Sequence, residues 1–214
     1  MTAGEYVVHG AKGTGSVAVE AALTLLELPY RVVETALFEH DRAEGGELRK
    51  VNPMMQVPAL ILPGGELMTE SSAILTWLAD SHPEARFSPG LAATTRPAFL
   101  RWMAFVSSAI YALYWIRDDT RRIVDDPDLG KEARRRLVAR ILNCWRAMND
   151  QVDPARYILG NDLTVLDLYV AVVSRWRPGR DRFADAAPKL ARVVQRVDAD
   201  PRLNTFWTQR FPFE

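Results

Sequence analysis

The sequence has few of the side chains that carry redox or metal chemistry. Its 214 residues include 1 cysteine, Cys144, and 3 histidines. A single cysteine excludes an intramolecular disulfide and a C-x-x-C redox pair, and a cysteine inside an apolar helical pattern is usually a small buried hydrophobe. His9, His40 and His82 form no closely spaced pair, so we expect no metal site.

Net charge and long apolar runs are also missing. The 27 basic and 27 acidic residues cancel, which gives no electrostatic reason to expect nucleic acid or an anionic membrane as a partner. No apolar run approaches the ~20 residues that span a bilayer, and residues 1–5 lack the charged and apolar regions of a signal peptide. We therefore expect a cytoplasmic protein that binds neither nucleic acid nor membrane.

The first third of the chain alternates strand and helix patterns. Strands are expected at residues 6–8 and 30–34 and in two short runs on either side of the turn at residues 63–65. Helices are expected at residues 16–26, around 47–50 and at 72–79. This β-α-β-α-β-β-α order predicts a small mixed sheet with helices on both faces. The turn-rich residues 81–90 form a linker.

Beyond the linker the pattern is helical. Apolar residues at i, i+3, i+4 spacing predict two long helices, over residues 102–116 and 137–152, separated by residues 125–130. Thr164-x-x-Asp167 has the form of a capping box, with aspartate in place of the usual glutamate. Residues 201–207 predict a last short helix with proline in its first turn.

Two neighbouring segments, residues 52–60 and 70–75, favour a peptide-binding site. Proline lacks an N–H, so Pro58 is expected only at the first residue of a strand or on an edge. If the Val57–Pro58 bond is cis, the backbone amide and carbonyl of Val57 turn outward and can pair with an extended ligand.

The second segment supplies charge. Ser71 is a candidate N-cap, and the free amides and positive dipole end of the following helix attract a carboxylate. Glu70 beside it can pair with an ammonium group. An ordinary β-hairpin followed by a capped helix accounts for the same residues equally well.

These segments resemble signatures of the cytosolic glutathione S-transferase superfamily, N-P-x-x-Q-V-P-A-L at residues 52–60 and E-S-x-A-I at residues 70–74. The similarity extends along the chain, through residues 6–10, 16–23 and 28–30 to the distal run at residues 160–167. The resemblance implies a thioredoxin-like glutathione-binding domain at residues 1–81 and an all-helical C-terminal domain at residues 91–214. It also implies that the capping box begins a buried core helix over residues 165–174.

The resemblance further implies which residues meet glutathione, the co-substrate, with no covalently bound cofactor. The glutathione-binding residues would be Gln56, Val57, Pro58, Glu70 and Ser71. Because a free thiol has a pKa of about 8.5, the family places a Tyr or Ser before the first helix to donate a hydrogen bond toward the sulfur, or a Cys that forms a mixed disulfide with glutathione. An ungapped count back from Leu23 puts His9, Gly13 and Gly15 at those three positions.

The loop at residues 9–16 offers substitutes for the missing residue. Ser16, and after it Thr14, carries a hydroxyl at the helix start, where amides and the dipole favour an anion. Lys12 is a positive neighbour, and the loop glycines allow close approach of a large sulfur. A plain helix cap at Ser16 remains the alternative, as does a loop whose amides alone stabilise the sulfur.

The resemblance leaves three functions open. The first is a detoxification enzyme that conjugates glutathione to small electrophiles, and the second is a glutathione-dependent isomerase or peroxidase. The third is a catalytically silent, transferase-like binding or regulatory protein. The family also implies a homodimer, and the surplus aromatic and apolar residues between Phe99 and Trp115 are consistent with a buried two-fold interface.

Overall fold

The protein forms two units in a computed structural model that describes residues 4–35 and 46–212. Residues 1–88 and 197–214 group as the first unit, and residues 89–196 as the second. The boundary falls within the expected linker. Residues 197–214, which the sequence assigned to the helical domain, group with the first unit because their helical turns pack against its first helix. His40 lies outside the described residues.

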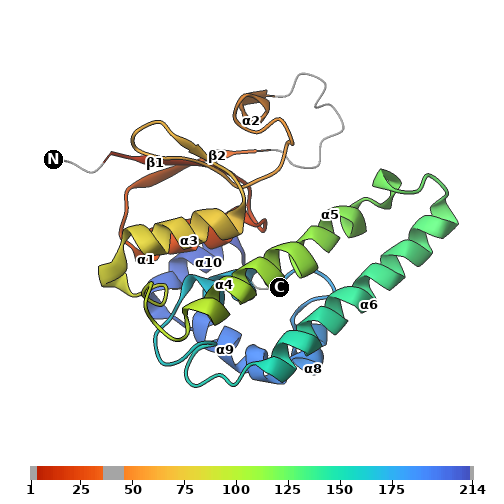
Figure 1. Ribbon diagram of the computed structural model, residues 1–214. Coiled ribbons are helices and arrows are strands. Elements are labelled where there is room, and N and C mark those ends of the chain that lie inside the picture. Colours follow the sequence, from red (N-terminus) through yellow and green to blue (C-terminus); the bar gives the residue numbers. More distant parts are fainter. Residues whose placement is uncertain (1–3, 36–45, 213–214) are drawn as a thin grey trace. The chain divides into compact units, whose positions relative to one another are not determined.

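The first unit is a four-stranded sheet with helices on both faces (Figure 1). The strand order is β2-β1-β3-β4, with β1 parallel to β2 and antiparallel to β3, and β3 antiparallel to β4. The elements are β1 (Tyr6–Gly10), α1 (Ser16–Leu25), β2 (Tyr30–Glu34), α2 (Gly46–Val51), β3 (Ala59–Ile61), β4 (Leu67–Met68) and α3 (Ser71–Ser81). This confirms the predicted order and the thioredoxin-like arrangement.

Helix α1 forms the centre of this unit. Its sequence SVAVEAALTL is rich in helix-forming and apolar residues, and every residue from Ser16 to Leu23 is buried. Glu20 is the one charged residue among these eight, and its side chain is fully buried. A buried carboxylate must be paired or hydrogen-bonded, so Glu20 needs partners from elsewhere in the fold.

The C-terminal end of the chain completes the first unit. Helix α9 (Pro188–Asp198) leads into a 3₁₀ turn, η5 (Pro201–Leu203), and then into α10 (Asn204–Arg210). The Asp200 side chain accepts from the Arg202 amide at 3.0 Å and caps the turn, with proline at its first position. Turn η5 packs against α1. The predicted short helix at residues 201–207 is thus confirmed, in two consecutive pieces.

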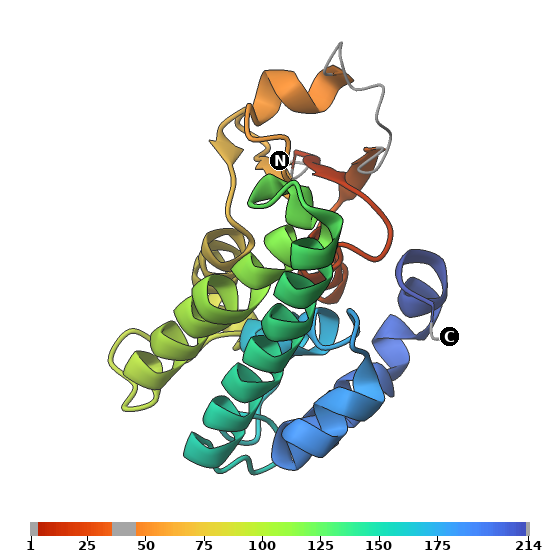
Figure 2. The same cartoon turned by 90° about the vertical axis from the view of Figure 1, so that its right-hand side faces the viewer.

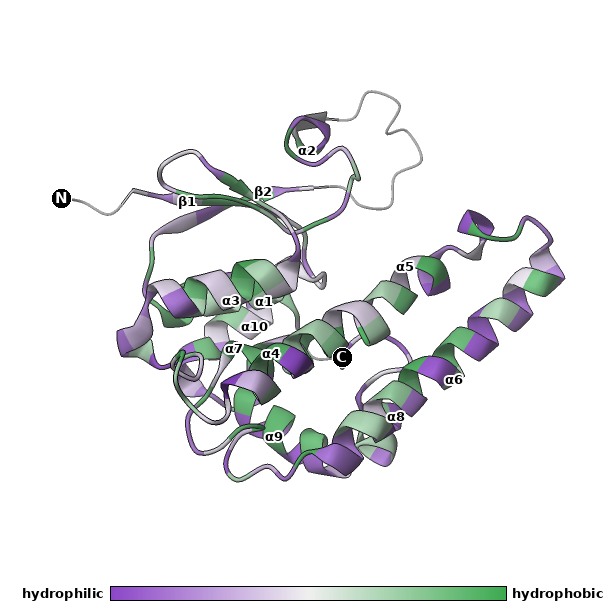
Figure 3. Ribbon diagram, in the orientation of Figure 1, coloured by the Kyte–Doolittle hydropathy of each residue, from purple (hydrophilic) through white to green (hydrophobic). Residues whose placement is uncertain are grey.

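The second unit is helical, and Figure 2 shows its long helices from the side. Its elements are α4 (Arg96–Phe105), a π-helical segment η3 (Val106–Tyr111), α5 (Ala112–Asp118), η4 (Thr120–Arg122), α6 (Pro127–Gln151), α7 (Val165–Val173), α8 (Arg180–Ala186) and most of α9, residues 188–196. The two predicted long helices correspond to the continuous α4–η3–α5 stretch and to α6. Figure 3 shows hydrophilic residues along much of α6, interrupted by hydrophobic ones, and Ile141, Trp145 and Met148 form its buried stripe.

Helix α6 begins earlier than the sequence suggested. Residues 125–130 were expected to separate the long helices, but α6 starts at Pro127. The Asp126 side chain accepts from the amides of Asp128 at 2.9 Å and Leu129 at 2.8 Å. An aspartate N-cap followed by proline at the first helical position is a strong start signal, so only Asp125 and Asp126 of the expected spacer precede the helix.

The predicted capping box is present at the start of α7. The Thr164 amide and hydroxyl both donate to Asp167 Oδ2, at 2.8 and 2.7 Å, and the Ile158 amide donates to Oδ1 at 2.9 Å. Every residue of α7 is buried. The box therefore satisfies donors at the end of a core helix that water cannot reach.

One helical stretch, Arg96–Asp118, is long and apolar enough to cross a membrane by length and composition. Core helices of globular domains meet the same criterion. Its buried residues include Phe99, Trp102, Val106 and Ile110, which follow the spacing of a helix face packed within a bundle.

Candidate functional site

Three chain segments meet at one end of the sheet of the first unit. Strand β4 runs parallel to β1, because each is antiparallel to β3. The loop after β1 (residues 11–15), the residues just before β3 (56–58) and Glu70 after β4 therefore lie at the same end. The register pairs His9 with Ala59, which places Pro58 next to the start of the loop. The structure thus brings the two predicted motifs and the loop predicted to hold the thiol, residues 11–15 and named the thiol loop below, to one end of the sheet.

The segment before β3 is held by a buried asparagine. Asn52 Nδ2 donates to the Gln56 carbonyl at 2.8 Å, and Asn52 Oδ1 accepts from the Met54 amide at 3.1 Å. The Gln56 side chain is exposed, Val57 and Pro58 are buried, and the Val57–Pro58 bond is cis. Asn52 fixes the chain path into this bond. Asn52 belongs to the motif at residues 52–60, but the motif alone predicts no role for it.

Glu70 occupies an unusual backbone conformation at the start of α3. Its φ is 65° and its ψ is 101°, and its side chain is exposed. The Glu70 carbonyl accepts from the Ile74 amide at 2.9 Å, so Glu70 takes the N-cap position. Ser71, expected as the N-cap, is instead the first helical residue and is buried. The helix starts one residue earlier than expected because the bend is made at Glu70.

Backbone strain supports a function for these two segments. Met55, with φ of 55°, and Glu70 are both non-glycine residues at positive φ. Glu70 lies outside the left-handed helical well, since its ψ is 101°. Such conformations cost about 1–3 kcal/mol each and cluster at binding and catalytic sites. Of the four described non-glycine residues at positive φ, Met55 and Glu70 are the two that lie in the motif segments.

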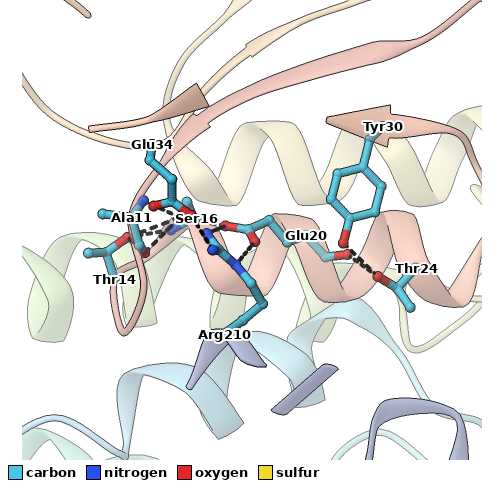
Figure 4. Close-up of polar contacts among 8 residues, drawn as sticks. All are labelled: Ala11, Thr14, Ser16, Glu20, Thr24, Tyr30, Glu34 and Arg210. Atoms are coloured by element: carbon cyan, nitrogen blue, oxygen red, sulfur yellow. Dashed lines mark hydrogen bonds and ion pairs between the residues drawn. The ribbon is translucent and has the colours of Figure 1, made fainter. Parts of the chain in front are cut away.

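The thiol loop is closed by its own hydroxyl groups (Figure 4). The Thr14 hydroxyl donates to the Ala11 carbonyl at 2.7 Å, and the Ala11 amide donates to Ser16 Oγ at 3.1 Å. The Ser16 hydroxyl lies 2.8 Å from Glu20 Oε1. Because an ionised carboxylate only accepts, Ser16 is the donor in that contact. The single hydroxyl hydrogen of Ser16 thus points toward Glu20.

Burial separates the two candidate hydroxyls. Ser16 is fully buried, whereas Thr14 is partly exposed and Lys12 is exposed. A side chain added at Gly10 would collide with Ser16 Oγ, so glycine is required where β1 meets α1. His9, the position used by the family's tyrosines, is buried as the last but one residue of β1. The geometry favours Thr14 over Ser16 as a group that a ligand can reach.

Two further residues anchor the loop, and the sequence analysis missed both. Glu20 accepts from Arg210 of α10, with its Oε2 2.5 Å from Arg210 Nε and its Oε1 3.2 Å from an Arg210 terminal nitrogen. The two residues are 190 positions apart. A glutamate inside an otherwise apolar helix signalled a buried partner, but no sequence pattern pointed to Arg210.

Comparison with known proteins places the sequence among glutathione S-transferase relatives. The family model described as "Glutathione S-transferase, N-terminal domain" matches residues 16–86. An uncharacterised GST-like protein of Escherichia coli K12, YncG, is 29% identical over 92% of this chain and 94% of its own length. Glutathione S-transferase GstA of Escherichia coli O157:H7 is 24% identical over 88% of this chain and 92% of its own.

Solved structures share the fold across both units. A glutathione transferase homolog from Sulfitobacter with bound glutathione has a TM-score of 0.81 at 22% identity and covers 98% of this chain and 99% of its own. A beta-class glutathione S-transferase of Sphingomonas chungbukensis has a TM-score of 0.77 at 23% identity over 96% of this chain and 98% of its own. With its sheet order, its paired motifs and these relatives, the chain belongs to the cytosolic glutathione S-transferase superfamily and is of the bacterial type.

Proposed function

We propose that the protein binds glutathione at the end of the sheet where β1 and β4 end and β3 begins, and that it conjugates the glutathione thiolate to small electrophiles. The observation that carries this proposal is the meeting of Gln56–Pro58, Glu70–Ser71 and the loop at residues 11–15 at one end of the sheet. Each segment offers a different chemistry: peptide pairing, charge pairing and thiolate stabilisation. Glutathione carries the three matching parts, as an extended peptide with a charged amino-acid end and a thiol.

The charged end of glutathione fits the start of α3. The exposed Glu70 carboxylate pairs with the ligand ammonium, and the Ser71 hydroxyl and first amides of α3 bind its carboxylate. The backbone of Val57 pairs with the cysteinyl peptide unit, beside the Gln56 side chain and the ring of Pro58. Charged hydrogen bonds of this kind contribute about 1.5–3 kcal/mol each.

The sulfur belongs at the loop before α1. Within residues 4–35 and 46–212, no hydrogen bond engages the amides of Lys12 and Gly15. Gly15 is buried, so the groups available to a thiolate near the positive end of the α1 dipole are the amide and positive charge of the exposed Lys12 and the Thr14 hydroxyl. Ser16 holds the loop from its buried side, because its Oγ accepts from the Ala11 amide. We assign Thr14 and the loop amides as direct donors and Ser16 as a buried support.

The reaction follows from a stabilised thiolate. Its proton passes to solvent, the sulfur lone pair forms a bond to the electrophilic carbon, and the leaving group departs with the bonding electrons. Each unit by which the bound thiol pKa falls below about 8.5 raises the thiolate fraction near neutral pH severalfold. We further propose a cytoplasmic homodimer.

A second candidate is a glutathione-binding protein without transferase activity. One observation favours it: the Ser16 hydroxyl is buried and donates to Glu20. Ser16 is the hydroxyl residue at the start of α1, and its hydroxyl hydrogen is therefore not directed at the ligand. Isomerase activity is a third route, since a Drosophila melanogaster relative named as a probable maleylacetoacetate isomerase is 38% identical over 72 residues, 33% of this chain and 31% of its own.

Two measurements on the purified protein separate these candidates. Calorimetry with glutathione tests binding, and a conjugation assay with a generic aryl halide tests transfer. Binding with turnover supports the transferase, and binding without turnover supports the silent protein or a different electrophile. Absence of glutathione binding would contradict all three candidates.

A further inference from the structure

Arg210, at the end of α10, joins three parts of the first unit (Figure 4). Its guanidinium pairs with both carboxylate oxygens of Glu20 on α1, at 2.5 and 3.2 Å. The same guanidinium donates to Glu34 at the end of β2. Its backbone carbonyl accepts from the Gly13 amide at 3.0 Å. One residue from the far end of the chain therefore contacts the thiol loop, the helix that follows it and the strand beside it.

The side-chain contacts reach the loop through Glu20. Glu20 is fully buried, and Arg210 is 12% exposed in its side chain. Glu20 Oε1 accepts from the Ser16 hydroxyl at 2.8 Å, and Ser16 Oγ accepts from the Ala11 amide at 3.1 Å. Arg210 thus fixes the carboxylate that orients Ser16, and Ser16 holds the first residue of the loop.

The backbone contact reaches the other side of the loop. Gly13 has a φ of 70°, a conformation that favours glycine. A β-carbon at Gly13 would lie 3.6 Å from the ring of Phe211, the residue after Arg210. The loop is therefore held at Ala11 from inside and covered at Gly13 by the chain end at residues 210–211.

We propose that residues 210–211 form a C-terminal clasp and that Arg210 is a positioning residue for the thiol loop. The inference rests on the proposed function, because it assigns the loop to the glutathione sulfur. Donors that are fixed before the reaction stabilise a developing or bound anion better than donors that must reorganise. The clasp keeps the loop amides and Thr14 in one arrangement, and it does so from outside the glutathione-binding residues.

Two variants loosen the clasp in different ways. Arg210→Lys keeps the positive charge but cannot form the two-pronged contact with Glu20 while also reaching Glu34. The double variant Glu20→Gln, Arg210→Met removes both charges, so no unpaired buried carboxylate remains to unfold the chain. Arg202→Lys is the matched control, because Arg202 lies in the same C-terminal segment, in η5, and pairs with Asp200 at 2.6 Å.

Hydrogen exchange measured without ligand tests the structural half of the proposal. In both clasp variants the amides of Ala11 and Gly13 should exchange at least about tenfold faster relative to the Val8 amide of β1, an effect of about 1.4 kcal/mol or more on loop opening. Dividing by the Val8 rate removes any global loss of stability. In Arg202→Lys the ratio should stay at the parent value.

The pH dependence of the thiolate absorbance of bound glutathione tests the functional half. Loosening the clasp should raise the apparent pKa of the bound thiol by roughly half a unit to one unit and lower kcat near neutral pH. The KM for glutathione should change less than twofold, because Glu70, Ser71 and Val57 are untouched. A residue that only stabilises the fold would leave the pH profile in place.

The outcomes separate this inference from the proposed function. If the Ala11 and Gly13 amides exchange at the parent rate in both clasp variants, the clasp is overturned. If they exchange faster but the pKa of the bound thiol is unchanged, the positioning role of Arg210 is overturned. A parent protein that binds no glutathione would overturn the proposed function and the positioning role, while the exchange ratio would still decide whether the clasp holds the loop.

Discussion

The Ser16 hydroxyl lies 2.8 Å from the buried Glu20 carboxylate, one helical turn along α1. The family places its thiolate-stabilising hydroxyls so that they meet the ligand, but here the hydroxyl at the helix start turns into the protein. A hydrogen bond to a charged acceptor is stronger than one to a neutral group. Ser16 therefore stabilises the buried ion pair, and the proposed function assigns thiolate stabilisation to its neighbours.

Ser16→Ala should lower stability more than it changes the bound thiol. The substitution removes a donor to Glu20 and an acceptor for the Ala11 amide, both shielded from water. We expect the free energy of unfolding to fall by about 1–3 kcal/mol. Denaturant unfolding measures this loss. Thiolate absorbance followed against pH should show a smaller shift in the pKa of bound glutathione than Thr14→Ala produces.

Thr14→Ala should act on the thiol. Thr14 is partly exposed, and its hydroxyl can leave the Ala11 carbonyl without stranding a buried charge. We expect the apparent pKa of bound glutathione to rise and turnover near neutral pH to fall, with affinity nearly unchanged. The reverse order of effects, with the larger pKa shift in Ser16→Ala, would make Ser16 the direct donor. If both single variants and the double variant have the pH profile of the parent, the backbone amides are the only remaining donors to the thiolate.

Glu70→Ala should weaken glutathione binding with little loss of fold. The Glu70 side chain is exposed, so its removal leaves no cavity, while the ligand ammonium loses its partner. We expect calorimetry to give roughly a tenfold or greater rise in Kd, since charged hydrogen bonds contribute about 1.5–3 kcal/mol. Glu66→Ala is the control, because Glu66 is an exposed acid in the preceding turn. Equal affinity in both variants would remove Glu70 from the site.

Asp167 should make stability fall as pH rises through about 6. Burial raises the pKa of this carboxyl from 3.8 to about 6, although the hydrogen bonds from Ile158 and Thr164 act in the opposite direction and lower it. The folded state therefore keeps its proton at pH values where the unfolded chain has lost it, and stability from this group is largest below pH 3.8 and lost above about 6. A rise of about two units corresponds to roughly 3 kcal/mol.

Asp167→Asn isolates that titration. The variant loses part of the capping box at every pH, but it has no proton to exchange at this site. The unfolding free energy of the parent minus that of the variant should decrease by about 2 kcal/mol between pH 4.5 and 7.5. A difference that stays constant or grows over this range would mean that the folded-state pKa of Asp167 is not raised.

The protein should be a dimer at micromolar concentration. Leu100 and Trp115, on α4 and α5, are 46% and 45% exposed, more than large apolar side chains on a single buried stripe require. A two-fold interface that covers this surface fits the assembly proposed above. Light scattering should give twice the chain mass of 24.1 kDa. A single-chain mass across the micromolar range would refute it.

Local sequence signals were sufficient for the elements of both units. The alternation at residues 6–8, the apolar spacing of the long helices and the Thr164-x-x-Asp167 box all act within one or two turns, and each predicted its element. Errors arose where two local signals competed. At residues 125–130 the turn composition masked the N-cap at Asp126 and the following proline, and at Glu70 a residue rarely found at positive φ makes the bend.

The sequence by itself determined the order of the strands and helices and the motif residues around Pro58 and Glu70. Only the tertiary structure decided which way the Ser16 hydroxyl points and that Arg210 reaches Glu20. The reason is physical. Helix caps and apolar periodicity depend on neighbours a few residues away, whereas the partner of a buried charge depends on which distant segment packs against it. For Glu20 that partner lies 190 positions along the chain.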